Sequence, residues 1–550
     1  MNRFSVRCAL LVLWPLAAAA GAADPDAVDR IRGEVRASST TEADMTERHR
    51  ALMDWASSLL GEGADIDPAL PREEAGDLMR LVRARDCERA CPRIDEAFRK
   101  LEALAGGEAG VRRRRLRAAV PPRTISLAVM TREVSVIDAV QVSEKGMLRA
   151  EDGRVSLEAG SEPVWVVEGK FPARRNLTPE RSPFGFHPAL CSGADGSPDY
   201  SCAHELGADW DRGGLYLMWV MGQPDLLKDE YDWRPFDDYF RRLPDSLMAL
   251  KNITVAHDGM VKRAGMPHVK RPSGHKKFDV TGYLEGTSYR PKDPEAYARW
   301  VKAAVRRYPR ARHWQVDNEP PRGREGYADL MRVTYTAIKE ANPKAQVLVG
   351  GLHLPYGRTA RAYERETLPI LRELGGKYLD IVDMHWFGGV GEWRDLAPAL
   401  DRLRTDLERH GFKDTPIWIT EMGTYSGRPG RMPEQTERDQ ASEVVRRYVT
   451  ALAEGVEKVF WAWGIDEGFM DPEDDDFFDR TGLIYDGIGE GDPGRGTRKA
   501  AYRAYAKMTE FLRRCEGGRP TRLQAEAGVV AYRFRFPGEE RGVLVVWLDH

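Results

Sequence analysis

Cysteine, net charge and long apolar stretches are all scarce in this sequence. Only 6 of its 550 residues are cysteine, and their spacings do not fit a structural zinc site. Lysine and arginine number 83 against 86 aspartates and glutamates. The chain therefore offers no strong field to nucleic acid or to an anionic membrane, and we expect no nucleic-acid partner.

Two catalytic motifs are also absent. No glycine-rich phosphate loop follows the first strand expected in the central region, which disfavours a doubly wound open sheet. No Gly-x-Ser-x-Gly nucleophile elbow is present, which disfavours serine hydrolase chemistry on an α/β sheet.

The longest apolar run lies at the N-terminus. Arg3 and Arg7 form a basic start, residues 8–20 are apolar, and Ala20-Gly21-Ala22 fits a small-x-small cleavage site. This pattern predicts a signal peptide over residues 1–22 and a secreted or periplasmic protein. The run is short for a bilayer span, with an uncleaved anchor as the alternative. We expect no integral membrane segment beyond it.

The cysteines suit an oxidising compartment. Cys191 and Cys202 flank a loop of Gly, Ser, Pro and Asp and are placed to form a disulfide. Cys87 and Cys91, four residues apart on an expected helix, either pair or are merely close. Cys515 has no evident mate.

Four segments follow the signal. Residues 23–117 are polar with apolar residues at helical spacing, which predicts a helical N-terminal region. Residues 118–180 turn to short β-branched runs, a small β-rich segment. Residues 181–515 alternate strand and helix. Residues 516–550 return to β alternation, a small C-terminal β module that is either incomplete or pairs with earlier strands.

The alternation over residues 181–515 predicts a (β/α)8 TIM barrel, an α/β fold in which each of eight strands is followed by a helix. The strands are expected at residues 184–187, 215–221, 253–257, 314–319, 346–350, 381–385, 417–421 and 459–463. The helices are expected at residues 203–207, 236–250, 294–308, 327–341, 368–374, 393–410, 437–455 and 499–512.

Two of these strands end in a glutamate. The stretch His313–Pro320 begins as a strand and closes on Asn318-Glu319-Pro320, where proline should stop the strand. Residues 416–423 again run from an apolar strand into a glutamate, Glu421. Glycoside cleavage needs two such carboxyl groups, one to protonate the leaving oxygen and one to attack the sugar or activate water. The alternative is that each glutamate simply ends its strand in solvent.

The same rim should collect further side chains, because every barrel strand delivers its last residues there. Asn318 is expected to donate to the sugar 2-hydroxyl, His385 to hydrogen-bond a carboxylate, and Trp463 to form the floor of a sugar subsite. The rigid, partly apolar setting of Glu319 should raise its pKa. We expect substrate-binding roles for His187, His257, Asn318, His385, Trp386, Tyr425 and Trp463.

Several of these residues carry a resemblance. Asn318-Glu319-Pro320 after the fourth strand, Glu421 after the seventh and Trp463 after the eighth resemble clan A of the glycoside hydrolases. Residues 182–187 (Ser-Pro-Phe-Gly-Phe-His), 205–210 (Glu-Leu-Gly-Ala-Asp-Trp) and 481–484 (Thr-Gly-Leu-Ile) resemble family 39 and its neighbours. The resemblance covers Ser182–Leu512. It implies retaining hydrolysis of a polysaccharide or oligosaccharide by double displacement, with Glu319 as acid/base and Glu421 as nucleophile.

One position departs from that pattern. The clan often has His-x-Tyr after the sixth strand, with the tyrosine bonding the nucleophile, whereas this chain has His385-Trp386-Phe387. His385 or Tyr425 would then have to steady Glu421. The missing phenol and the long helical N-terminal region motivate an alternative, a polysaccharide-binding barrel of an export or surface assembly with little hydrolysis. A transglycosylase is a third candidate.

No cofactor or metal is expected. The acidic run at residues 471–476 does not have the ligand spacing of a calcium loop and is more simply a solvated loop. His257 and His268 are more simply partners of substrate or backbone than metal ligands. Arg322 and Arg324 either meet an acidic sugar or face solvent.

Overall fold

The computed structural model describes residues 120–192, 197–228, 230–256, 282–286, 288–320, 325–429, 432–468, 476–489 and 491–549. Several predictions fall outside these residues: the signal peptide, the helical region 23–117, Cys87, Cys91, His257, His268, Arg322, Arg324 and residues 471–475.

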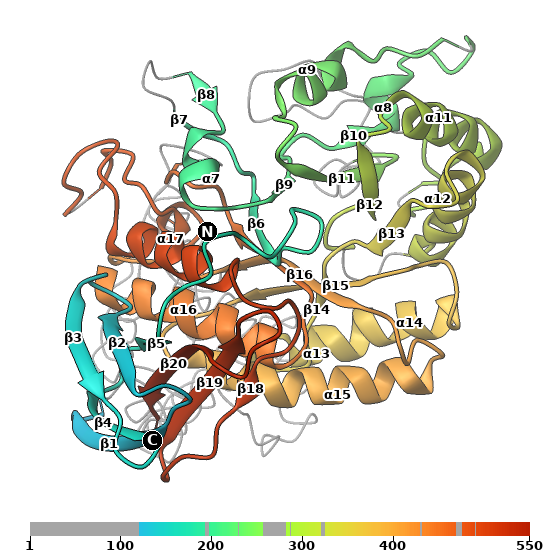
Figure 1. Cartoon of the computed structure of the whole chain (residues 1–550). Coiled ribbons are helices and arrows are strands. Elements are labelled where there is room, and N and C mark those ends of the chain that lie inside the picture. The colour runs from blue at the N-terminus through green and yellow to red at the C-terminus, as the bar shows by residue number, and fades with distance from the viewer. Residues whose placement is uncertain are drawn as a thin grey trace, which may run out of the picture.

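The described residues form a ring of eight parallel strands at the centre of the molecule (Figure 1). In chain order these are β6 (Phe184–His187), β9 (Trp210–Arg212), β11 (Met248–Thr254), β12 (Ala311–Val316), β13 with β14 (Gln346–Val349, Leu352–His353), β15 (Val382–Phe387), β16 (Ile417–Gly423) and β17 (Lys458–Ala462). Strand β17 pairs with β6, and a bridge from Leu348 to Ile381 joins the fifth strand to the sixth. The predicted (β/α)8 barrel is confirmed.

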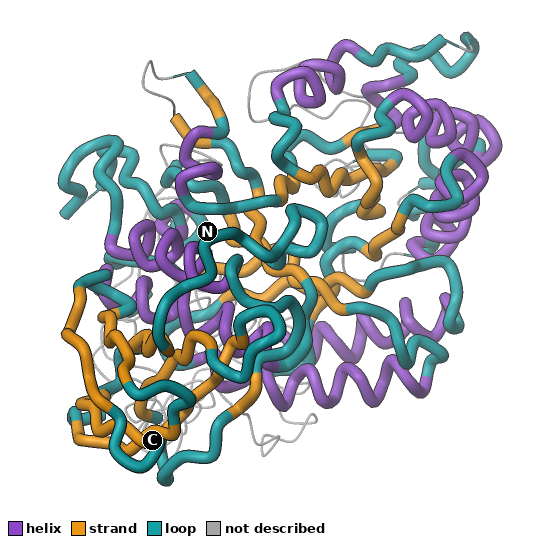
Figure 2. Tube along the Cα trace, viewed as in Figure 1, coloured by secondary structure: helices purple, strands orange, loops and turns teal. Residues whose placement is uncertain are grey.

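Helices lie outside the ring, and Figure 2 shows purple segments to the right of and below the central orange strands. The longer ones are α9 (Arg234–Arg242), α11 (Pro294–Arg307), α12 (Tyr327–Ala341), α14 (Leu368–Leu374), α15 (Leu396–Arg409), α16 (Glu437–Ala453) and α17 (Ala500–Leu512). Local sequence sets their starts. The Asp293 side chain accepts the Ala296 N–H at α11, and Thr436 with Asp439 forms a capping box at α16. Among the described residues, no helix is both long and apolar enough for a bilayer span.

Inside the ring, side chains follow the two-residue period of a strand. A lower layer, nearest the N-terminal ends of the strands, is apolar apart from His313 and consists otherwise of Trp210, Leu250, Leu348, Ile381, Trp418 and Phe460. Gly185 belongs beside it, because a Cβ there would lie 2.5 Å from the Phe460 ring. An upper layer, one inward position further along, is polar and buried and consists of Arg212, Asn252, Gln315, Asp383 and Thr420. The C-terminal rim therefore stands on a polar layer.

The β-rich segments at the two ends of the described chain form one module, where the cyan and dark red strands meet in Figure 1. A six-stranded sheet runs in the order β18 (Thr521–Arg522), β19 (Val529–Arg535), β20 (Gly542–Leu548), β5 (Val164–Glu168), β2 (Glu133–Asp138), β3 (Glu144–Arg149). β1 (Arg123–Ala128) pairs with β4 (Arg154–Ala159), and their apolar faces share a core with this sheet. The C-terminal strands thus pair with earlier strands, which was one of the two alternatives for residues 516–550. The predicted β segments 118–180 and 516–550 therefore form one unit.

The predicted second strand, residues 215–221, is wrong. Only Leu217–Met218 is extended there, as the short β10 beside β11, and residues 219–222 form a helical turn, α8 (Trp219–Gly222). The apolar side chains of this stretch pack outward, with Trp219 against Tyr297. The second barrel strand is β9. It was not predicted because three of residues 209–212 are charged, which is unusual for a buried strand.

The predicted helix 236–250 also runs too far. Helix α9 ends at Arg242, and Leu243 is extended because the residue before a proline, here Pro244, avoids the helical region. Strand β11 then begins at Met248, earlier than predicted.

The disulfide between Cys191 and Cys202 is present and ties β7 (Cys191–Ser192) to α7 (Ser201–Glu205), just after the first barrel strand. Cys515 is buried and carries a free thiol. The predicted disulfide between Cys191 and Cys202 is confirmed.

Candidate active site

The backbone that presents Glu319 is turned sharply. Strand β12 ends at Val316, and both Asp317 (φ 62°) and Glu319 (φ 42°) adopt the left-handed region that non-glycine residues rarely enter. The Asp317 carboxylate accepts the Asn318 N–H at 2.8 Å and so stabilises the turn. Strained positions of this kind cluster at functional sites, where the surrounding structure holds them.

The barrel brings the two predicted catalytic glutamates together. Glu319 and Glu421 each place a carboxylate oxygen within 4.8 Å of the other and of a ring nitrogen of His385. Their exposures differ, since the Glu319 side chain is 46% exposed and that of Glu421 only 1%. One carboxyl group therefore faces the solvent side of the rim, and the other is enclosed beneath it.

Arg212, the last residue of β9, holds the site from below, and it was missed because β9 itself was missed. Its Nη1 donates to Glu421 Oε1 at 2.7 Å, its Nη2 to Asn318 Oδ1 at 2.5 Å and its Nε to Gln315 Oε1 at 2.6 Å. The planar guanidinium thus fixes one catalytic carboxylate and the amide beside the other. The signal available in the sequence was the alternation Trp210-Asp211-Arg212, an inward charge two residues after an inward tryptophan.

His385, on β15, lies between the two glutamates. Its Nδ1 is 2.7 Å from Glu319 Oε1 and 3.5 Å from Glu421 Oε2. Gly351 leaves room for the ring, because a Cβ there would overlap His385 Nε2. Burial would lower the pKa of the imidazole, but the charge of Glu421 and the hydrogen bond and charge of Glu319 outweigh it and raise that pKa above 6.5.

The pKa values of the glutamates differ from expectation. Partial burial favours a raised pKa for Glu319, yet the hydrogen bond and charge of His385 prevail and lower it to about 2. The prediction of a raised pKa for Glu319 is therefore wrong, because it considered the proline and tryptophan nearby and not the histidine. Burial raises the pKa of Glu421, and the charges of His385 and Arg212 offset this only in part.

His187 and Trp463 lie together at the rim. Their ring centroids are 4.6 Å apart, and the backbone N–H of Trp463 donates to Thr481 Oγ1 at 2.9 Å. His187 Nδ1 donates to the Arg212 carbonyl at 2.5 Å, which leaves Nε2 facing Glu421 Oε1 at 3.7 Å. Burial and the Arg212 charge hold the pKa of His187 well below 6.5, so its ring is neutral.

Two residues predicted to bind substrate, Trp386 and Tyr425, are buried against protein groups. Trp386 is fully buried between the ring and α16, with the Arg447 guanidinium 4.5 Å over its ring, because it follows the inward His385 on the strand. Tyr425 is 1% exposed and donates its hydroxyl proton to the Pro433 carbonyl at 2.6 Å. Glu421 is therefore held by Arg212 and approached by His385. At Phe387, the position of the missing phenol, the ring packs on Phe477 and Phe478.

Within the described part of the chain, two groups of side chains have the donor types of a metal site. One is the set Glu319, His385 and Glu421, whose donor atoms already face one another in a hydrogen-bonded cluster. The other is Glu467, Asp486 and Asp492, where Glu467 is paired with buried Lys499.

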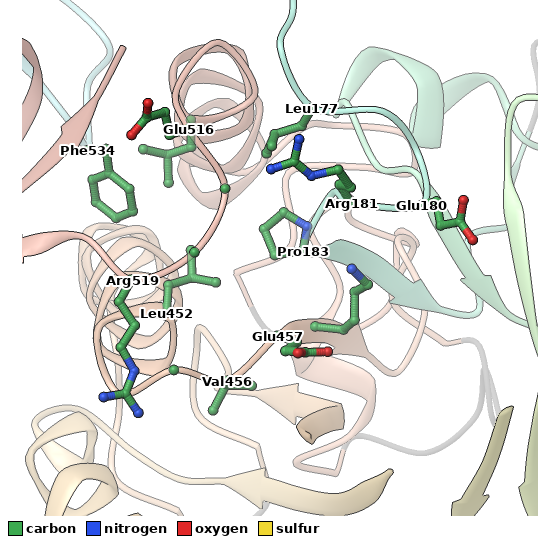
Figure 3. A pocket seen from close by; sticks show the side chains of 15 residues that line it. Leu177, Glu180, Arg181, Pro183, Leu452, Val456, Glu457, Glu516, Arg519 and Phe534 are labelled. Carbon is green, nitrogen blue, oxygen red and sulfur yellow. The ribbon is translucent and has the colours of Figure 1, made fainter. Parts of the chain in front are cut away.

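A cavity of about 520 Å³ lies at the opposite end of the barrel, between the ring and the β module (Figure 3). Pro183, just before β6, and Lys458, the first residue of β17, line it together with Phe534 of β19. The start of each strand lies far from its catalytic rim, so this cavity is not part of the site. A second cavity, of about 510 Å³, lies beside the rim and is lined by Cys191, Cys202 and Asp466.

No protein-family model and no curated protein matches the chain. Similar solved structures include a family 39 glycoside hydrolase from the gut symbiont Bacteroides cellulosilyticus WH2, 15% identical with a TM-score of 0.47 over 76% of this chain and 85% of that one. A glucosidase from Croceicoccus marinus is 16% identical, with a TM-score of 0.44 over 65% and 72%. A β-D-glucuronidase of Dictyoglomus thermophilum is 12% identical, with a TM-score of 0.35 over 70% and 68%. The family that the sequence motifs resemble is among them. Because these TM-scores are below 0.5, the function proposed below rests on the rim side chains.

Proposed function

We propose that this chain is a retaining glycoside hydrolase that cleaves O-glycosidic bonds of a polysaccharide or oligosaccharide by double displacement. The observation that carries the proposal is the facing pair of carboxylates after the fourth and seventh strands, with an oxygen of each within 4.8 Å. Retaining enzymes keep their carboxyl groups about 5–5.5 Å apart, whereas inverting enzymes leave roughly 6.5–9.5 Å for a water. The facing oxygens, within 4.8 Å of each other, leave little room for a water between them, which supports retention.

The two glutamates take different roles because their surroundings differ. Glu421, enclosed and held at 2.7 Å by Arg212, is the nucleophile that attacks the anomeric carbon. Glu319, exposed on the rim, is the acid/base that serves the leaving oxygen and then water. Because Arg212 occupies the amide oxygen of Asn318, the amide NH2 is the group that donates to a sugar hydroxyl. The Trp463 ring provides an aromatic face for the sugar.

The compartment and partner are part of the same proposal. The predicted signal peptide directs the chain to a secreted or periplasmic location, and the Cys191–Cys202 disulfide suits such an oxidising compartment. The partner is then a carbohydrate met outside the cytoplasm.

Replacement of the nucleophile tests the proposal. Glu421→Gly should lower turnover of aryl glycosides by at least about 10⁴-fold, because no covalent intermediate forms. Azide should restore turnover and yield a glycosyl azide of inverted configuration. Glu319→Ala is the matched control: it should spare kcat/KM of activated aryl glycosides and lower kcat, because their first step needs no acid whereas attack by water still needs the base. Full activity of Glu421→Gly would end the proposal.

The 2.7 Å contact between His385 Nδ1 and Glu319 Oε1 favours the second candidate, a polysaccharide-binding barrel with little hydrolysis. His385 keeps Glu319 ionised, since it lowers the pKa of that carboxyl to about 2, and an ionised carboxylate has no proton for a leaving group. A glycan array read beside a reducing-sugar assay separates the two functions. Binding without product at high protein concentration would favour the binding barrel.

A further inference from the structure

We propose that His385 is a positioning residue that stores the proton which Glu319 gives to the leaving group and recovers from water. The inference rests on the proposed function and deepens it. It explains how a site whose exposed carboxylate is ionised at rest can still supply a proton.

The hydrogen bonds around His385 fit a ring that is protonated on both nitrogens. Its Nδ1 meets the carboxylate of Glu319 at 2.7 Å. Its Nε2 meets Thr420 Oγ1 at 3.3 Å, and that hydroxyl already donates its own proton to Asp383 Oδ2 at 2.7 Å. The hydroxyl oxygen can therefore only accept from Nε2. Nδ1 and Glu319 Oε1 then share one proton. The solvent exposure of Glu319 and the Glu421 carboxylate 3.5 Å from Nδ1 favour the form in which the ring carries that proton.

The charges around the ring also favour its protonated form. Three carboxylates face it, namely Glu319, Glu421 at 3.5 Å and Asp383 at 3.8 Å from Nε2. One guanidinium, Arg212, compensates part of this charge, and His187 is neutral because its pKa is lowered. The histidine His353 interacts electrostatically with Glu319 and is paired with Glu366 at 3.0 Å. A buried cluster with this excess of negative charge is stabilised by one positive imidazole.

The catalytic cycle moves this proton without net gain or loss. In the first step the Glu421 carboxylate bonds to the anomeric carbon and the bond to the leaving oxygen breaks. That oxygen takes a proton from Glu319, which takes one from His385 Nδ1, so the imidazole ends neutral and Glu319 ends ionised. In the second step water attacks the anomeric carbon and releases the Glu421 carboxylate. The water proton passes through Glu319 back to His385.

The coupling has a physical cause. Among the groups that keep the buried His385 protonated, the negative charge of Glu421 has the largest effect, and ester formation removes that charge. The histidine therefore loses its proton as the nucleophile reacts, which is when the leaving group needs it. Hydrolysis of the ester restores both charges.

Two substrates and one variant test the inference. His385→Gln keeps a side-chain donor towards Glu319 but cannot carry a proton at neutral pH. For a substrate with a poor leaving group, kcat/KM at neutral pH should fall by about 10²-fold or more. For an activated aryl glycoside, which needs no proton, it should fall by less than about 10-fold. The alkaline limb of the poor substrate should move to lower pH, because Glu319 must then carry its own proton.

His313→Gln is the matched control. His313 is also buried, but it packs at the lower end of the barrel with its ring centroid 5.1 Å from that of Trp418. This variant should leave both pH profiles unchanged. Equal losses on the two substrates with an unmoved limb in His385→Gln would show a purely structural role and overturn the inference.

Measurements on the unaltered protein guard against a misfolded variant. Histidine ¹⁵N chemical shifts should show His385 doubly protonated above pH 6.5 in the free protein and neutral once a fluorinated glycoside traps the ester on Glu421. A ring that stays protonated in the trapped state would refute proton storage. If the wild type hydrolyses neither substrate, the proposed function itself fails.

Discussion

The two layers inside the barrel follow the same strands and have opposite chemistry. The lower layer is a cluster of aromatic and aliphatic side chains such as Trp210 and Phe460, and its contribution is hydrophobic burial. The upper layer holds Arg212, Gln315 and Asp383 in a hydrogen-bonded network. A cluster of buried polar groups costs free energy unless every member is paired. The comparison teaches that the fold is stabilised at one end of each strand and the site is built at the other.

The largest difference between the layers should come from Arg212→Lys. A lysine ammonium cannot make the three bonds that the planar guanidinium donates to Gln315, Asn318 and Glu421. We expect kcat/KM to fall by about 10²–10³-fold with the protein still folded. Arg307→Lys on helix α11 is the control, because Arg307 makes a two-point ion pair with Asp237 far from the rim. A loss as large in the control would break the comparison.

Phe460→Ala should have the reverse profile. It removes a fully buried ring from the lower layer and should lower the free energy of unfolding by about 3–5 kcal/mol. The kcat of the folded fraction should stay within about 3-fold, because the polar layer above is untouched. Denaturant unfolding and kinetics below the transition measure the two effects. A large drop in kcat without a stability loss would contradict the division of roles.

The acid limb of the pH profile reports on the upper layer alone. Burial raises the pKa of Glu421 above 4.5, so the nucleophile should protonate, and kcat/KM should fall, as pH drops through a value higher than that of a free glutamate. The two glutamates and His385 titrate as a coupled set, so the apparent pKa of the acid limb is a property of all three groups together. A limb at or below 4.5 would show that the carboxylate is better stabilised than its burial implies.

Phe387→Tyr should have the smallest effect. It restores the phenol that the resemblance led us to expect, but Arg212 already holds Glu421 at 2.7 Å. We expect kcat/KM to change by less than about 10-fold, since a second donor adds little to an occupied carboxylate. An increase well beyond that would mean that the nucleophile is under-stabilised in the natural chain.

Much of the barrel was predictable, because its signals are local. Helices α12 and α14 and strand β6 were predicted with the bounds that the structure shows, since their apolar periodicity and end signals lie within the element itself. Strand β9 was not predictable in this way. Its three residues, Trp-Asp-Arg, carry charge into the ring, and the more apolar stretch at 215–221 competed for the assignment.

The features of the site also divide into those that the sequence predicts and those that depend on distant residues. Asn318, Glu319, His385, Glu421 and Trp463 could be placed at one rim by counting strands. The misplacement of Trp386 came from reading a run of residues as one surface, although strand neighbours point to opposite faces. The pKa of Glu319 could not be predicted, because the histidine that sets it lies 66 positions along the chain.

The order of strands and helices and the two strand-ending glutamates are properties of the sequence by itself, because periodicity and proline act over a few residues. Which side chains meet depends on the closed ring. Arg212 and Glu421 are 209 positions apart, and only strand register and closure bring the guanidinium under the carboxylate and the His385 imidazole between the two glutamates. Those contacts, in turn, decide which carboxyl group is enclosed and which is open to a sugar.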